Sequence, residues 1–141
     1  MKSLNDYFQI VSESAQGDLR NHPVIRNIYL AGYFEYNVKK GGFAQLLFNL
    51  KGEYLKATEQ MLVETNAPLA LKFYLKALKI CLENKTEYQR FINGGYIEKN
   101  ELKDNLHLLS LDYYKESIEF SDEVKQYLAE NHSVLEMYAG K

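Results

Sequence analysis

The chain has 141 residues, of which 46% are hydrophobic and 26% charged, and its net charge is −2. This composition is typical of a globular protein, so we expect residues 1–141 to fold as a single domain. One cysteine and two prolines exclude a disulfide scaffold and a cysteine-rich zinc module. The small net charge argues against a protein whose whole surface binds nucleic acid.

The N-terminal residues contain no apolar stretch of signal-peptide length, and no apolar run long enough to span a membrane occurs in the chain. The single Cys81 lies in an apolar helical pattern, which fits a reducing compartment. These features predict a cytoplasmic protein with no membrane partner.

Apolar residues recur with the period of an α-helix along almost the whole chain, and sustained strand alternation is missing. Ser3 and Asp6 predict a capping pair for the first helix, and Asn21-His22-Pro23 predicts the start of the second. We therefore expect an all-α fold of about six or seven helices. The predicted helices cover residues 3–16, 23–40, 43–49, 53–65, 68 to the break at Gly94-Gly95, 106–119 and 121–138.

The helix that begins at Pro68 is apolar over most of its circumference, which is typical of a central helix. One predicted apolar face consists of Leu71, Tyr74, Leu75, Leu78 and Leu82. A second predicted apolar face consists of Phe73, Ala77, Ile80 and Cys81. Its exposed strip is expected to consist of Lys72, Lys76 and Lys79. In the helices that follow, we expect the core stripe to consist of Leu108, Leu111 and Ile118.

Charge is distributed unevenly, because residues 91–141 carry five basic and ten acidic side chains, a net charge of −5. Four of the acids are spaced 4, 3 and 4 residues apart. They would form one helical stripe about 16 Å long if the helix continues through Ser121, or two adjacent stripes if it breaks there. These four are Asp112, Glu116, Glu119 and Glu123. We expect them to be exposed, either as a solvated helix face or as a surface for a protein partner.

Residues 34–52 predict a helix end, a double-glycine corner and a short helix. We expect Gly41 to adopt the left-handed conformation that ends the helix. Gln45 and Asn49 are four residues apart and share a face, so they are predicted to be buried and to bond free backbone groups at the corner. The alternative is a small-ligand or enzymatic site formed by Asn37, Gln45 and Asn49.

The corner carries a recognisable pattern, formed by Gly41, Gly42, Phe43, Gln45, Asn49 and Gly52. Together with Leu111-Asp112-Tyr113-Tyr114, it resembles a bacterial family of unknown function that includes a DNA-mimic protein antagonising a helix-turn-helix repressor. The resemblance implies an all-α fold. It also implies DNA mimicry toward a DNA-binding protein. From the charge distribution, we expect a protein partner to bind the acidic C-terminal third.

Motifs for catalysis are missing from the sequence. His22, His107 and His132 have no metal-ligand spacing, and no phosphate loop or nucleophile elbow occurs. We therefore expect no cofactor and favour a non-enzymatic interaction protein. The ligand site at the corner stays open as the alternative. Direct nucleic-acid binding through Lys39, Lys40 and the lysines that follow Pro68 is disfavoured, because too few cations share one side.

Overall fold

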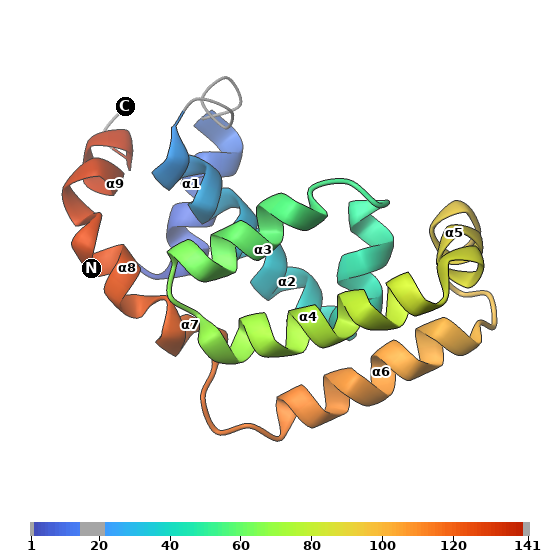
Figure 1. The fold of residues 1–141 in the computed structure, drawn as a ribbon. Coiled ribbons are helices and arrows are strands. Elements are labelled where there is room, and N and C mark those ends of the chain that lie inside the picture. The colour runs from blue at the N-terminus through green and yellow to red at the C-terminus, as the bar shows by residue number, and fades with distance from the viewer. Residues whose placement is uncertain (1, 15–21, 140–141) are drawn as a thin grey trace.

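The computed structural model describes residues 2–14 and 22–139, which form an array of helices with no strand among them (Figure 1). The predicted all-α fold is thus confirmed. The helices are α1 (Leu4–Ser14), α2 (Pro23–Leu50), α3 (Leu55–Glu64), α4 (Pro68–Glu83), α5 (Lys85–Asn93), α6 (Glu101–Tyr114), α7 (Phe120–Glu123), α8 (Lys125–Glu130) and α9 (His132–Ala139). Two predicted features, the end of the first helix at residues 15–16 and the start at Asn21, lie outside the described residues.

Helix α2 is the centre of the arrangement and packs against α1, α3 and α6. Helix α4 lies antiparallel and adjacent to α6, and it also contacts α3, α5 and α7 (Figure 1). The last helix, α9, packs against α1. The N-terminal and C-terminal helices therefore close one end of the molecule, while α5 lies at the other.

Local signals placed several helix ends correctly. Ser3 and Asp6 form the predicted reciprocal pair, in which the Ser3 backbone amide donates to Asp6 Oδ2 at 3.0 Å and the Asp6 amide donates to Ser3 Oγ at 3.2 Å. Pro23 and Pro68 both occupy the first turn of their helices. The start of α6 was not predicted: Asn100 caps it by accepting a hydrogen bond from the Lys103 amide at 3.1 Å.

Other boundaries differ from the prediction. The helix predicted to run from Pro68 to the double glycine divides at Asn84, where φ is −134° and ψ is 53°. Residues 101–105, predicted as loop, form the first turns of α6. The segment 121–138 divides into short helices at Val124 and Asn131. At each break the chain changes direction, so that the next helix packs against the same core. The local spacing of apolar residues does not indicate where such a break falls.

The buried face of α4 differs in part from the predicted one. Tyr74 is fully buried as expected, but Leu75 is 42% exposed and Leu82 is 63% exposed. Phe73, Ala77 and Cys81, which belong to the second predicted face, are buried. An apolar helix fits several orientations, and contact with both α3 and α6 selects this one.

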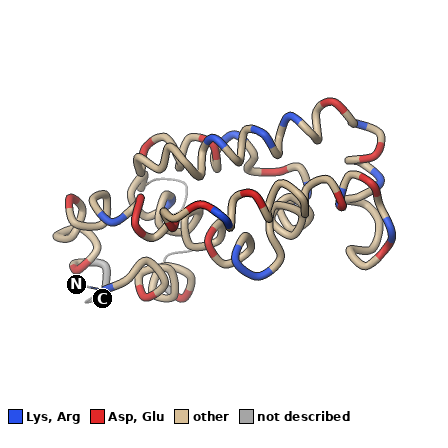
Figure 2. Tube along the Cα trace, turned by 90° about the horizontal axis from the view of Figure 1, so that it is seen from below, with Lys and Arg blue, Asp and Glu red and all other residues tan. Residues whose placement is uncertain are grey.

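Acidic and basic positions are interleaved along most of the trace, so no single sign of charge dominates the molecule (Figure 2). Among the described residues, no helix has the length and apolar character needed to cross a membrane.

Candidate functional site

The double-glycine corner interrupts α2. The last two helical turns, which follow the corner, fold back against the part of α2 that precedes it. Gly42, with φ of 69° and ψ of −166°, adopts the conformation that favours glycine, whereas Gly41 has φ of −142°. The prediction of a left-handed Gly41 is therefore wrong by one residue. Beyond Gly42 the helix restarts, and the Phe43 amide donates a hydrogen bond to Ser110 Oγ of α6 at 2.9 Å. Phe43 itself is fully buried.

Asn37 joins the two halves of α2 across this corner. Its side chain is buried, and its Oδ1 accepts hydrogen bonds from Gln45 Nε2 at 3.1 Å and from Asn49 Nδ2 at 2.7 Å. Its Nδ2 donates to the Tyr33 carbonyl oxygen at 2.9 Å. The amides were predicted to be buried and to bond the backbone, but Gln45 is half-buried, Asn49 is exposed, and both bond the Asn37 side chain. A carbonyl oxygen with two lone pairs can serve both donors, so the hub needs only one buried residue.

The acidic residues do not form one helical stripe. Helix α6 ends at Tyr114 and α7 begins at Phe120, so Glu116 and Glu119 lie in or beside an irregular linker. Asp112, Glu116 and Glu119 are exposed as predicted. Glu119 and Asp122 form a capping box around α7, in which the Glu119 amide donates to Asp122 Oδ2 at 3.3 Å.

Glu123 differs from the other three acids, because it is not exposed as the sequence predicted for all four. It is half-buried, and its carboxylate accepts hydrogen bonds from the Leu69 amide at 2.7 Å and the Ala70 amide at 3.0 Å. These amides belong to the first turn of α4, where free N–H groups and the helix dipole favour a negative charge. Glu123 therefore caps a neighbouring helix, a role that sequence spacing does not reveal.

The predicted core stripe beside the acids is also wrong. Leu108, Leu111 and Ile118 are 62%, 54% and 53% exposed. Helix α6 instead buries the face that carries Leu102, Leu106, Ser110 and Tyr113. The acidic linker consequently adjoins exposed apolar side chains. We name the surface of Asp112, Glu116, Glu119, Leu111 and Ile118 the acidic-apolar surface.

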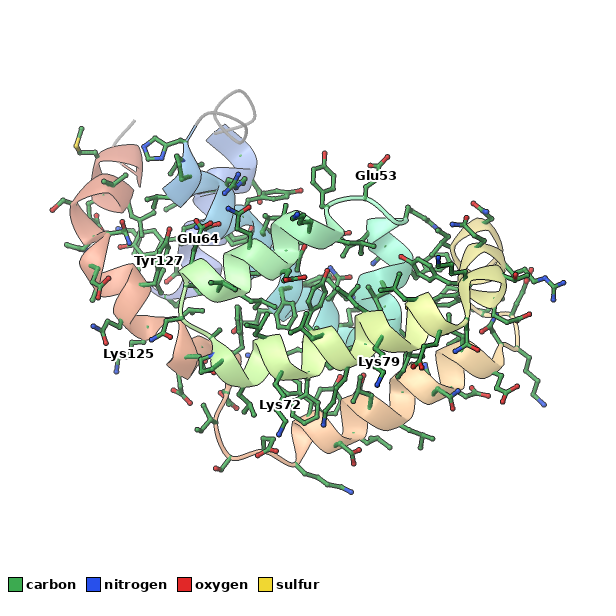
Figure 3. All side chains as sticks on the ribbon, viewed as in Figure 1. Glu53, Glu64, Lys72, Lys79, Lys125 and Tyr127 are labelled. Atoms are coloured by element: carbon green, nitrogen blue, oxygen red, sulfur yellow. The ribbon has the colours of Figure 1, made fainter. Side chains whose placement is uncertain are left out.

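The lysines of α4 lie apart from these acids. Lys72, Lys76 and Lys79 are exposed, and Lys72 and Lys79 extend from the lower edge of α4 in the view of Figure 3. Within the described part of the chain, none of the three is within ion-pair distance of an acid. Lys76 Nζ lies 5.2 Å from the centre of the Phe73 ring. The strip is thus a solvated face, as predicted for this helix.

Among the described residues, the structure shows neither an exposed cysteine nor a cluster of metal-ligating side chains. Cys81 is 2% exposed, and burial raises the pKa of its thiol to about 12, so it is protonated and shielded at neutral pH. No group of three metal-ligating side chains gathers in residues 2–14 and 22–139.

The hollows at the surface of the described residues include a larger and a smaller one. The larger, of about 800 Å³, is lined by Asn49 and by Arg26, Tyr29, Tyr33 and Tyr54 among others. The smaller, of about 160 Å³, lies between α2 and the segment from Tyr113 to Phe120. Only the larger one touches the amide corner, through Asn49.

The fold and the surface together define an all-α protein whose most distinctive features are an amide corner centred on the buried Asn37 and an exposed acidic-apolar surface. A comparison with protein families matches residues 20–132, about four-fifths of the chain, to the DMP19-like proteins. The chain therefore belongs to the DMP19-like protein family. Comparisons with curated proteins and with solved structures found no match.

Proposed function

We propose that the protein is a non-enzymatic interaction protein that binds a protein partner through its acidic-apolar surface. The observation that carries the proposal is that the short segment 111–119 exposes Asp112, Glu116 and Glu119 together with the apolar side chains of Leu111 and Ile118. Apolar side chains supply contact area in a protein interface, and charges around them steer the encounter and select the partner.

The sharper form of the proposal is local DNA mimicry toward a DNA-binding protein. Membership of the DMP19-like family supports this form, as do the exposed carboxylates of the linker. Because charges of both signs are interleaved elsewhere (Figure 2), the mimicry is confined to the acidic-apolar surface. A basic DNA-binding surface is complementary to this one in charge.

A capture experiment tests the proposal. The immobilised full chain is compared with a triple variant carrying Asp112→Asn, Glu116→Gln and Glu119→Gln, which spares the capping residue Glu123. The matched control neutralises three exposed acids elsewhere: Glu83→Gln, Glu98→Gln and Glu130→Gln. We expect the first variant to lose a DNA-binding partner that the control retains. Added duplex DNA should release the partner, and salt should weaken its capture.

Equal capture by both variants would contradict the use of this surface. Capture that duplex DNA does not release would contradict DNA mimicry and leave the general interaction role. Circular dichroism and urea unfolding of both variants separate lost binding from lost folding.

A second candidate function is small-ligand binding in the larger cavity. Its size, its three tyrosines and Arg26 suit a planar anion, because aromatic faces stack and the guanidinium pairs with negative charge. Tyr54 also adopts a left-handed backbone conformation, with φ of 57°. A thermal-shift series with nucleoside monophosphates tests this candidate: stabilisation that Tyr54→Ala abolishes would support it, and no stabilisation by any of them would contradict it.

A further inference from the structure

The smaller cavity, of about 160 Å³, has an unusual lining. Helix α2 contributes Phe34, Glu35 and Lys39, and the segment that follows Leu111 contributes Tyr113 and Glu119 among others. The lining thus combines aromatic faces with carboxylates. It adjoins the acidic-apolar surface, because Glu116, Ile118 and Glu119 belong to both.

Two residues that line this cavity each carry a buried polar atom that forms no hydrogen bond with the described part of the chain. Tyr113 is 8% exposed, and its hydroxyl forms no hydrogen bond within the described residues. The Oε2 atom of Glu35 is also buried and has none. A buried polar group without a partner destabilises the folded state, so such groups are uncommon and call for an explanation. Here both atoms can accept a hydrogen bond from an incoming donor.

The surroundings of Tyr113 favour a positively charged donor. Burial raises the pKa of the phenol well above its usual value, and the nearby charges of Glu123, Glu35 and Glu119 raise it further. The phenol therefore stays neutral at physiological pH, and its oxygen lies in a negative field. The rings of Phe34 and Phe120, with centres 4.8 Å apart, add aromatic faces that attract cations.

Lys39 already brings one cation to the site. Its Nζ lies 3.6 Å from Glu35 Oε2, which is too far for a hydrogen bond but close enough for an ion pair. The Lys39 side chain is 61% exposed, whereas that of Glu35 is only 13% exposed. Lys39 can therefore withdraw into solvent while the carboxylate remains in place, and a better donor can replace it.

We propose that this cavity binds the guanidinium group of an arginine side chain presented by the protein partner. The planar guanidinium offers five donors, which suit Glu35 Oε2 and the Tyr113 hydroxyl together, and it stacks on aromatic rings better than an ammonium does. That the arginine belongs to a protein partner rests on the function proposed above. The affinity of the cavity for a guanidinium group does not depend on that function.

The test is a nuclear magnetic resonance titration of the full chain with N-acetyl-arginine amide. N-acetyl-citrulline amide, its uncharged isostere, is the ligand control. We expect saturable shifts of the amide signals of Tyr113, Tyr114 and Phe120 with the arginine compound and none with the citrulline compound. No saturable shift, or equal shifts with both compounds, would overturn the proposal.

Three variants make the test specific. Glu35→Gln removes the charge and should weaken binding about tenfold, and Tyr113→Phe removes a hydroxyl that has no partner and should weaken it about threefold. Lys39→Gln removes the competing cation and should strengthen binding. The matched control, Glu83→Gln, removes an exposed charge outside the cavity and should leave binding unchanged. A purely structural role would not produce the gain with Lys39→Gln, so unchanged or weaker binding in that variant would overturn the proposal.

Partner capture then separates the two proposals. Loss of capture in Glu35→Gln and Tyr113→Phe supports an arginine presented by the partner. Binding of the free arginine compound with unchanged capture overturns that source, and it points to a small guanidinium compound while leaving the proposed interaction function intact. If the acidic triple variant retains capture but the titration succeeds, the proposed function fails and the cavity chemistry stands.

Discussion

Gly42 occupies a backbone conformation that few other residues tolerate, and it also lacks room for a side chain. A Cβ atom at this position would lie 2.4 Å from Ser110 Oγ and 2.8 Å from Ser110 Cβ. We expect Gly42→Ala to lower the free energy of unfolding by about 2–4 kcal/mol, since backbone strain and the clash with α6 both act. Urea unfolding measures the loss.

Gly52 is the matched control for this prediction. It also has a positive φ, of 78°, but a Cβ atom at this position would lie 3.6 Å from its nearest neighbour, Ile92 Cδ1. Gly52→Ala should therefore cost only about 1–2 kcal/mol, from backbone strain alone. Equal losses in the two variants would mean that contact with Ser110 contributes nothing.

Asn37 and Asn49 share a hydrogen bond but differ in burial, so their alanine variants should differ in stability. Asn37→Ala removes the shared acceptor from a buried position and should cost about 2–3 kcal/mol. Asn49→Ala changes an exposed residue, and water can replace its bond, so it should cost less than about 1 kcal/mol. Similar urea midpoints for the two variants would contradict the hub role of Asn37.

At the scale of elements, Glu123 links α7 to the start of α4. Glu123→Ala leaves the Leu69 and Ala70 amides without their acceptor and should cost about 1–2 kcal/mol, because capping bonds and the helix dipole are lost together. Glu116→Ala, which removes an exposed acid, should cost less than about 0.5 kcal/mol. Chemical unfolding of both variants measures the difference. Equal stabilities would mean that Glu123 does not stabilise α4 and is only a solvated surface acid.

Contacts among α2, α3 and α8 show how distant segments are tied together. Asn27 of α2 is buried and donates through Nδ2 to Glu64 Oε1 at 3.0 Å and to Tyr127 Oη at 3.1 Å. Glu64 and Tyr127 consequently lie close together in Figure 3.

At the scale of the whole molecule, Cys81 reports on the integrity of the core. Its thiol is buried in α4 and stays protonated, so a chromogenic disulfide reagent should react with it only when the fold opens. We expect the native reaction to be slower than that of unfolded chain by roughly a thousandfold or more, in keeping with ordinary domain stability.

A neighbouring position supplies the control. Leu82 is 63% exposed, so a variant with Cys81→Ala and Leu82→Cys carries its thiol on the surface of the same helix. That thiol should react rapidly in the native state. Fast labelling of native Cys81 would show that α4 opens locally without global unfolding.

The sequence by itself determined the helical class, the Ser3–Asp6 cap, the proline starts at Pro23 and Pro68, and the existence of a corner at the double glycine. These features depend on neighbouring residues, whose conformational preferences and hydrogen bonds operate within one or two turns. Only the tertiary structure decided which face of α6 is buried, because both Leu108 and Leu106 fit an apolar pattern and contact with α2 and α4 selects the second. It also decided that Glu123 caps a distant helix and that Tyr113 and Glu35 line one cavity, since such pairings depend on how remote segments pack and local periodicity carries no information about them.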